Sequence, residues 1–150
     1  MNIEDIIKTK TELPFFRKAI VNLLYTENWI SDQINTELKT YDISIQQFNV
    51  LRILKGQEGK PANLSTIQDR MVSKMSNTTR LVDKLIKKNL VKRVTCKSNR
   101  RKVEITITDQ GYNFLDEVSP AMNNFEKKIT SNLSQEELIT LNDLLNKLRS

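Results

Sequence analysis

The sequence predicts a mainly α-helical protein with a small β-hairpin wing, of the α+β class: a winged helix-turn-helix flanked by N- and C-terminal helices. Apolar residues recur at three- and four-residue steps along most of the 150 residues, which is typical of one-sided helices. The period changes to two in residues 91–107, which predicts a short hairpin. Basic residues are concentrated in the middle third of the chain, so this region is expected to bind a partner.

Composition argues against most enzyme classes. With one cysteine and no histidine, the chain has no disulfide framework and lacks the commonest zinc ligand and general base. Carboxylates such as Asp69 and Asp83 fit helix surfaces, and no pair of nucleophile and base is apparent. We therefore expect no enzyme, no metal and no cofactor. No apolar run approaches the roughly 18 residues of a membrane span, and acids occupy the place of a signal peptide's apolar stretch, so a cytoplasmic protein is expected.

Residues 1–40 are predicted to hold one long helix, from about Pro14, which suits a first turn, to about Leu38. A long one-sided helix needs a partner that buries its stripe. Packing within the chain and contact with a second copy fit the spacing equally well; the second interpretation makes this an N-terminal dimerisation helix. The stripe consists of Leu13, Phe16, Ile20, Leu23, Ile30 and Ile34.

Residues 41–108 are predicted to form the winged helix-turn-helix. Ser44 and Gln47 have capping-box spacing at the start of a short core helix, which ends at Gly56.

A second capping spacing and a short turn predict the rest of the helix-turn-helix. Ser65 with Gln68 predicts a brief helix, a turn follows at residues 72–74, and Ser76 or Ser73 is expected to cap the next helix. That helix has one apolar side, so its other side is free to contact a ligand. The polar and basic side consists of Ser76, Asn77, Thr79, Arg80, Lys84 and Lys87.

The wing begins where this helix ends. Asn89 is expected to adopt the left-handed conformation that ends a helix, with Leu90 as the apolar contact typical of such an ending. The segments VKRVTC and KVEITIT then alternate with period two on either side of a basic tip, KSNRR, which predicts two strands joined in a hairpin.

Residues 109–150 are predicted to form C-terminal dimerisation helices. Thr108 is placed to cap the first, Pro120 is expected to kink it, and Ser134 with Glu137 forms a capping box for the second. Their apolar stripes have no obvious cover within the chain. The stripes consist of Leu115, Val118, Met122, Phe125 and Ile129, and then Leu138, Leu141, Leu145 and Leu148.

The distribution of charge indicates the partner. Residues 61–107 hold 12 basic and 3 acidic groups, whereas residues 1–60 are neutral overall and residues 108–150 have a net charge of −3. A localised positive field concentrates polyanions, so nucleic acid is the leading partner, and a lysine-rich solvated face is the alternative. All nine aromatic residues lie outside the basic segment. Without rings on which bases can stack, double-stranded DNA is favoured over single strands and RNA.

In a helix-turn-helix, the second helix enters the major groove and its N-terminal residues meet base edges. Arg80 is placed to reach a guanine edge or a phosphate, and the cations of the wing tip suit a narrow minor groove and phosphates. Capping and solvation are the alternative roles of these side chains. The predicted DNA-binding residues are Ser65, Thr66, Ser76, Asn77, Thr78, Thr79, Arg80, Lys84, Lys97, Ser98, Asn99, Arg100, Arg101 and Lys102.

The stretch from about Ile43 to Gly111 resembles the MarR family of transcriptional regulators. The resemblance rests on RLVDKL, on KKNLVKR leading into the wing, on the NRR tip and on ITITDQG; the flanking helices are similar to the family's dimerisation ends. It implies a homodimer that binds a pseudopalindromic operator, usually as a repressor released by a small molecule or by oxidation. A winged helix that binds an acidic protein partner is the alternative function. Asn99 stands where the family usually has an acid, and Asn89 where it usually has glycine.

The resemblance also implies an effector pocket between the DNA-binding part and the helical ends. Such a pocket would take a small aromatic or other apolar effector, although aromatic rings are more often core residues. Redox-sensing relatives use a cysteine near the first helix, whereas Cys96 falls in a wing strand. Arg93, Lys92 and Lys97 could lower the pKa of its thiol, and an inert thiol is the alternative. The expected pocket residues are Phe15, Phe16, Tyr25, Trp29 and Phe48.

Overall fold

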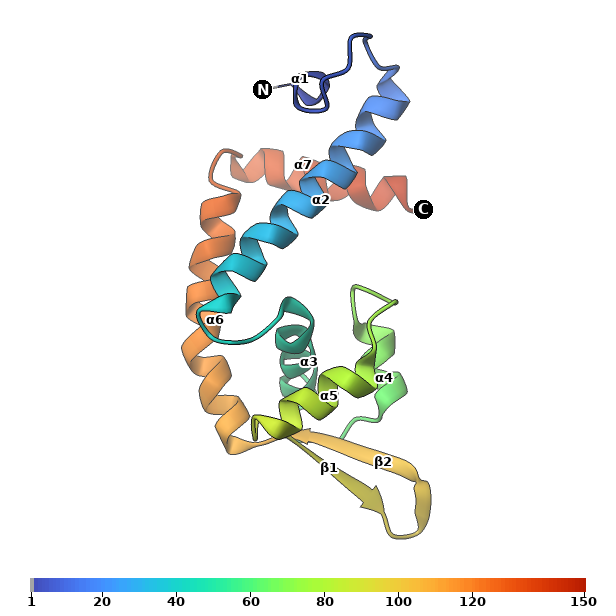
Figure 1. The fold of residues 1–150 in the computed structure, drawn as a ribbon, viewed down its shortest axis with the longest axis vertical. Helices are drawn as coiled ribbons and strands as arrows, with labels where there is room; N and C mark the ends of the chain where they lie inside the picture. Colours follow the sequence, from blue (N-terminus) through green and yellow to red (C-terminus); the bar gives the residue numbers. More distant parts are fainter. Residues whose placement is uncertain (1) are drawn as a thin grey trace.

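A computed structural model describes residues 2–150; the side chains of Arg100 and Arg101, two of the predicted DNA-binding residues, lie outside that description. Figure 1 shows α3, α4, α5 and the hairpin gathered at one end of the molecule, with α1 and α7 towards the other end. The predicted class, mainly α-helical with a β-hairpin wing, is confirmed. The elements are α1 (Ile3–Ile6), α2 (Phe15–Lys39), α3 (Ile45–Lys55), α4 (Leu64–Arg70), α5 (Thr78–Lys87), β1 (Val91–Cys96), β2 (Asn99–Ile107), α6 (Asp109–Ile129) and α7 (Gln135–Leu148).

The hydrophobic core lies in the lobe that contains the helix-turn-helix. Its members come from the apolar sides of α3, α4, α5 and α6 and from the hairpin, so amphipathic helices enclose the root of the wing. Of the described residues of α2, Leu38 alone is buried. The long helix therefore joins this core only through its C-terminal end. The largest fully buried side chains are Leu38, Leu51, Leu54, Ile67, Met71, Leu85, Ile105 and Leu115.

Two predicted capping boxes are formed. At the start of α3, Gln47 N donates to Ser44 Oγ (3.2 Å) and Ser44 N donates to Gln47 Oε1 (3.1 Å). At the start of α7, Glu137 N donates to Ser134 Oγ (3.2 Å) and Ser134 N donates to Glu137 Oε2 (2.8 Å). Each box satisfies two backbone donors that a helix start leaves without partners.

The predicted cap of α4 is wrong. The helix begins at Leu64, and Asn63 is its N-cap, accepting from Thr66 N (2.8 Å). Ser65 is already inside the helix, where its hydroxyl donates to Asn63 Oδ1 (2.7 Å). The Thr66 hydroxyl donates to the same oxygen (2.9 Å). Asn63, two residues earlier, thus has the capping role that the spacing of Ser65 and Gln68 suggested for Ser65.

Helix α5 has a different N-cap from the predicted one, whereas its C-terminal end is as predicted. Its N-cap is Asn77, which accepts from Arg80 N (3.1 Å), and neither Ser76 nor Ser73. At the other end, Asn89 has the expected left-handed backbone, with φ of 58°. Asn89 N donates to the Ile86 carbonyl (2.9 Å) and Leu90 N to the Leu85 carbonyl (3.1 Å), the two bonds of a Schellman ending.

The hairpin is antiparallel, with Val91 opposite Ile107 and Cys96 opposite Asn99. Its turn consists of residues 97–98, so it is narrower than the predicted basic tip, part of which belongs to β2. Ala62 pairs with Ile105 through backbone bonds of 2.9 and 2.7 Å. This bridge attaches the wing to the segment before α4.

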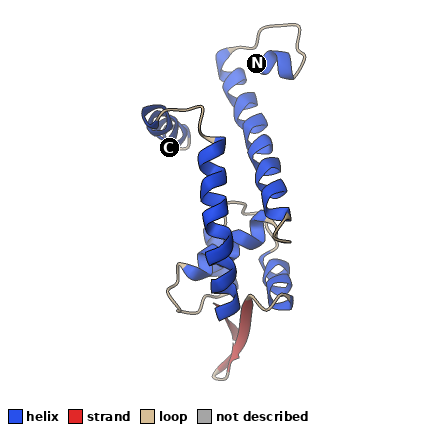
Figure 2. Ribbon diagram, turned by 90° about the vertical axis from the view of Figure 1, so that its left-hand side faces the viewer, coloured by secondary structure: helices blue, strands red, loops and turns tan. Residues whose placement is uncertain are grey.

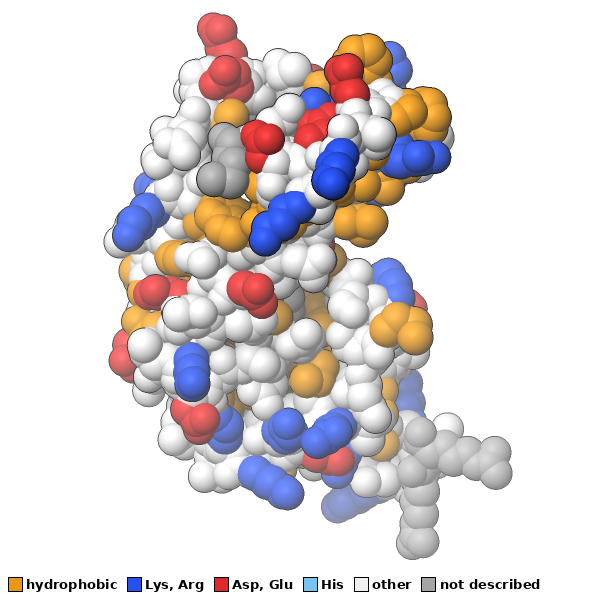
Figure 3. All heavy atoms as spheres, turned by 45° about the horizontal axis from the view of Figure 1, so that its top comes forward, with side chains coloured by type: hydrophobic (Ala, Val, Ile, Leu, Met, Phe, Trp, Pro, Cys, Tyr) orange, Lys and Arg blue, Asp and Glu red, His pale blue; other side chains and the backbone are white. Residues whose placement is uncertain are grey.

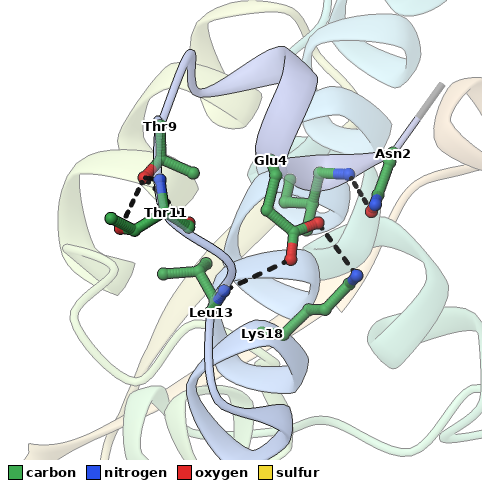
Figure 4. A network of polar contacts seen from close by, with 7 residues as sticks. Asn2, Glu4, Thr9, Thr11, Leu13 and Lys18 are labelled. Atoms are coloured by element: carbon green, nitrogen blue, oxygen red, sulfur yellow. Dashed lines mark hydrogen bonds and ion pairs between the residues drawn. The ribbon is translucent and has the colours of Figure 1, made fainter.

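The short helix α1 was not predicted from the sequence. It folds back against the start of α2, where Lys18 Nζ lies 2.9 Å from Glu4 Oε2 and Leu13 N donates to Glu4 Oε1 (3.5 Å; Figure 4). The ammonium of Lys18 lowers the pKa of the Glu4 carboxyl. Ile3 is buried. Only a few residues long, α1 depends on these contacts, because isolated helices of this length are unstable.

The predicted start of α2 at about Pro14 is confirmed, but the chain leaves most of the helix uncovered. Phe16, Ile20 and Leu23 of the predicted stripe are exposed. Helix α7 has no buried residue, and Figure 2 shows it set apart from the rest of the fold at the end of α6. α6 itself is continuous through Pro120. Packing within the chain therefore leaves the stripes of α2 and α7 uncovered. The expectation was wrong for α6, because the core of the chain itself buries Leu115, Val118 and Met122 of its stripe.

Gly111, in the first turn of α6, tests the packing between α6 and the root of the wing. A Cβ atom there would lie 2.2 Å from the Leu90 carbonyl oxygen and 2.6 Å from Ile107 Cγ1. We expect Gly111→Ala to lower the free energy of unfolding by about 1 to 3 kcal/mol through this overlap, although alanine is the better helix former. Urea denaturation measures the effect. Gly56→Ala is the control, because its nearest contact would be 3.4 Å; equal stability of the two variants would contradict the packing argument.

Candidate nucleic-acid interface

The predicted division of α5 into two sides is confirmed. Val82 and Leu85 are fully buried, while Thr79, Arg80 and Lys84 are exposed. The free face thus carries a hydroxyl and two cations, and Lys87 extends it towards the C-terminal end. Figure 3 shows Lys and Arg side chains along the lower edge of the molecule, on the lobe that contains α5.

Gln68 of α4 fixes the N-terminal end of α5, a role that sequence reasoning missed. Its Nε2 donates to the Lys74 carbonyl (2.6 Å), and its Oε1 accepts from the Thr78 hydroxyl. Thr78, predicted to meet DNA, is buried in this contact and does not belong to the exposed face. In the sequence, Gln68 is recognisable only as a polar residue next to the apolar Ile67. Its neighbours in the chain do not indicate that its partner is Thr78, 10 residues away.

Two ion pairs hold the rest of α5. Lys88 Nζ lies 2.8 Å from Asp42 Oδ2 and also donates to the Asp42 carbonyl, so the end of α5 is attached to the turn between α2 and α3. Arg93 Nη1 lies 2.9 Å from Asp83 Oδ1, which attaches α5 to β1. Both pairs are partly exposed, and such pairs add little stability. Their effect here is to fix where the exposed face of α5 points.

A hollow of about 440 Å³ opens at the N-terminal end of α5 and is called here the α5 N-terminal hollow. It brings together four of the predicted DNA-binding residues, Ser76, Asn77, Arg80 and Lys84. Its lining consists of Ser44, Gln46, Ser73, Met75, Ser76, Asn77, Arg80, Leu81 and Lys84.

The predicted wing residues lie apart from α5. Figure 1 shows the tip of the hairpin projecting beyond the helices. Lys97, Ser98, Asn99 and Lys102 are exposed. Lys102 of β2 shares a hollow with Ser65, so the structure joins the predicted residues of α4 to those of β2.

Cys96 is half-buried at the end of β1. Its Sγ lies 3.0 Å from Ser98 Oγ, and hydrogen bonds from Ser98 and from the backbone of Asn99 lower the pKa of the thiol. The charge of Glu104 opposes this shift. The pKa of the thiol is thus lowered by hydrogen bonding and not by the three cations that the sequence suggested.

Of the five aromatic residues expected in an effector pocket, one lies in the core and four are exposed on α2. Phe48 is 3% exposed and belongs to the core, whereas Phe15 is 88% exposed on α2. Phe16, Tyr25 and Trp29 are exposed on the same helix. The sequence pattern could not separate a core ring from a surface ring, because all five fit amphipathic helices.

A different hollow, of about 540 Å³, lies between α2, α3 and α5 and is called here the lysine hollow. Lys84 lines it as well as the α5 N-terminal hollow. The acid in its lining, Asp42, is already paired with Lys88, so the hollow presents positive charge. The lining consists of Asn35, Lys39, Asp42, Ile43, Ser44, Gln47, Lys84, Lys87 and Lys88.

Within residues 2–150, no three His, Cys, Asp or Glu side chains gather closely enough to hold a metal ion. In the same range, no helix is both long enough and apolar enough to cross a membrane.

Comparisons with known proteins agree on one family. Residues 43–103 match the MarR family. The chain is 30% identical to the HTH-type transcriptional regulator PapX of Escherichia coli over 83% of its own length and 76% of PapX. It is 27% identical to the transcriptional repressor MprA of Escherichia coli strain K12, over 99% of its own length and 87% of MprA. Among solved structures, BpsR of Bordetella bronchiseptica, whose DNA binding is regulated by 6-hydroxynicotinic acid, has a TM-score of 0.77 at 19% identity, over 88% of this chain and 99% of BpsR.

The ion pair between Asp42 and Lys88 predicts a pH dependence. The hydrogen bond and charge of Lys88 lower the pKa of Asp42 below its ordinary value of 3.8. The pair therefore stabilises the fold above pH 3.8, and this contribution is lost as the pH falls through the lower pKa of the folded state. Asp42→Asn suits the left-handed backbone at this position, where φ is 53°. We expect this variant to be less stable than the wild type at neutral pH and equally stable in acid, measured by urea denaturation across pH.

A stability difference that does not change with pH would contradict this assignment. Lys88→Met is the complementary variant, and it should return the NMR-measured pKa of Asp42 to its ordinary value.

Proposed function

The chain belongs to the MarR family of transcriptional regulators, and on that premise we propose that it is a homodimeric repressor that binds a pseudopalindromic operator in double-stranded DNA. A small anionic effector releases it. The single observation that carries the proposal is the exposed face of α5, where Thr79, Arg80 and Lys84 lie on a helix held by three other elements. The relatives that it matches are transcription regulators and not enzymes.

The geometry of α5 fits a major groove, which is about 12 Å wide and admits one helix. Arg80 and Thr79, in the first turn, are placed for base edges, and Lys84 and Lys87 are placed for phosphates. Thr78 takes no part in this proposal because it is buried. The wing, with exposed Lys97, Ser98, Asn99 and Lys102, supplies a second contact on the flanking minor groove.

A second copy is the partner proposed for the uncovered ends of the chain. Large apolar side chains are exposed along α2 and α7, more than a monomer usually leaves in water. Joining these ends buries them and sets two α5 helices at a fixed spacing, which a pseudopalindromic operator requires. The exposed residues include Phe15, Phe16, Ile20, Leu24, Ile139, Leu144 and Leu148.

The lysine hollow is the proposed effector site, in place of the aromatic set. Its positive charge favours a carboxylate or phenolate, and BpsR, which shares the fold, responds to an aromatic carboxylic acid. Because Lys84 lines both this hollow and the DNA-facing side of α5, an anion bound here competes with a phosphate for the same ammonium group. Release by oxidation of Cys96 remains an untested prediction.

A winged helix that binds an acidic protein is the second candidate, because the same basic face would attract either polyanion. Sequence preference separates the two functions. Base reading distinguishes an operator from a scrambled duplex, whereas an acidic polypeptide would compete with both duplexes equally.

Duplex binding across a salt series tests the proposed function, with duplexes selected from a random-sequence pool against scrambled ones. We expect two chains per duplex, affinity that falls steeply as salt rises, and a preference of about 10³ or more. Arg80→Ala should reduce the preference more than the overall affinity, and Arg149→Ala in the C-terminal region is the matched arginine control. One chain per duplex, or no preference at low salt, would contradict the proposal.

The effector site is tested with a panel of aromatic carboxylates and phenolates that includes 6-hydroxynicotinate. We expect at least one compound to weaken operator binding by the wild type, and Lys39→Met to keep operator affinity while losing most of that response. Lys39 lines the lysine hollow from α2 but is not on α5. Lys147→Met on α7 is the control. A response retained in full by Lys39→Met would place the effector elsewhere.

A further inference from the structure

The turn between α4 and α5 holds two apolar side chains almost entirely in solvent. Met75 is 94% exposed and Val72 is 90% exposed. Single exposed apolar residues are common on protein surfaces, so exposure alone assigns neither a role. Their surroundings differ, since Met75 lines the α5 N-terminal hollow and Val72 is not among its lining residues.

The backbone that carries Met75 is fixed. Ser76 N donates to the Ser73 carbonyl (3.2 Å), which closes a turn with Met75 at its third position. Gln68 Nε2 holds the preceding carbonyl, that of Lys74, at 2.6 Å. Met75 is therefore presented at a defined place, and less freedom is lost when a partner binds there than if the turn were loose.

The chemistry beside Met75 suits one kind of partner. The hollow places the hydroxyl of Ser76, the amide of Asn77 and the guanidinium of Arg80 next to the apolar side chain of Met75. In the major groove, standard bases present donors and acceptors together with a single apolar group, the C5-methyl of thymine. A methionine side chain is flexible and polarisable, so it can follow such a group.

We propose that Met75 recognises a thymine of the operator through its C5-methyl group, so that part of the sequence specificity comes from the turn and not from α5. The inference rests on the proposed function, because it requires a duplex bound at α5. Burial of one methyl group corresponds to about 0.8 kcal/mol, which is a factor of about four in affinity at each half-site.

Replacement of thymine by uracil tests this proposal, because it removes only the methyl group. Duplexes selected by the wild type from a random-sequence pool are prepared with uracil at one thymine position at a time. We expect uracil at one position of each half-site to weaken wild-type binding about fourfold and to leave binding by Met75→Ala unchanged. Val72→Ala, the matched control from the same turn, should keep the wild-type sensitivity.

The failures of the two proposals are distinguishable. If the wild type selects operators but Met75→Ala shows the same sensitivity to uracil at every position, the role of Met75 is refuted. The same holds if the wild type is insensitive to uracil throughout. A wild type that selects no duplex refutes the proposed function, and the role of Met75 with it. Because Met75 is exposed, both alanine variants should fold, which circular dichroism checks.

Discussion

The burial of one side of α5 is the constraint on which the rest of the structure depends. Val82 and Leu85 have no exposed surface, and their packing against the other helices of the lobe fixes the rotation of α5 about its axis. Once that rotation is set, Thr79, Arg80 and Lys84 must point away from the core, into solvent. A hydrophobic effect that is itself non-directional thus produces a directed polar face, because the helix period separates the two kinds of residue.

Polar contacts then fix the position that packing leaves adjustable. Gln68 holds the start of α5, Lys88 attaches its end to Asp42, and Arg93 attaches its side to β1. Partly exposed contacts of this kind contribute little to folding free energy. They matter for geometry, since a recognition surface loses affinity when its groups must be ordered on binding. The contact between Lys88 and Asp42 also connects α5 to the turn that follows α2, the helix that carries the uncovered apolar surface.

The buried core and the uncovered apolar surface lie in different parts of the molecule. The core lies in the lobe of α3, α4, α5 and the wing, whereas α7 and the N-terminal part of α2 keep apolar side chains in water. The lobe has its own core, and the proposed second copy would cover the exposed ends. The lysine hollow lies where the two parts meet, so an occupant would contact α2 and α5 at once.

The sequence by itself determined the features that depend on neighbours within about four residues. The capping boxes at Ser44 and Ser134, the left-handed Asn89 and the two sides of α5 were all predictable, because helix ends and helix faces are local properties. Local patterns are not always sufficient: two residues near the start of α4 could cap it, and the cap is Asn63 and not the predicted Ser65. Only the tertiary structure decided the pairing of Gln68 with Thr78, 10 residues apart, and of Asp42 with Lys88, 46 residues apart. Such contacts, and the burial of Phe48 against the exposure of Phe15, depend on how helices pack and not on any period within them.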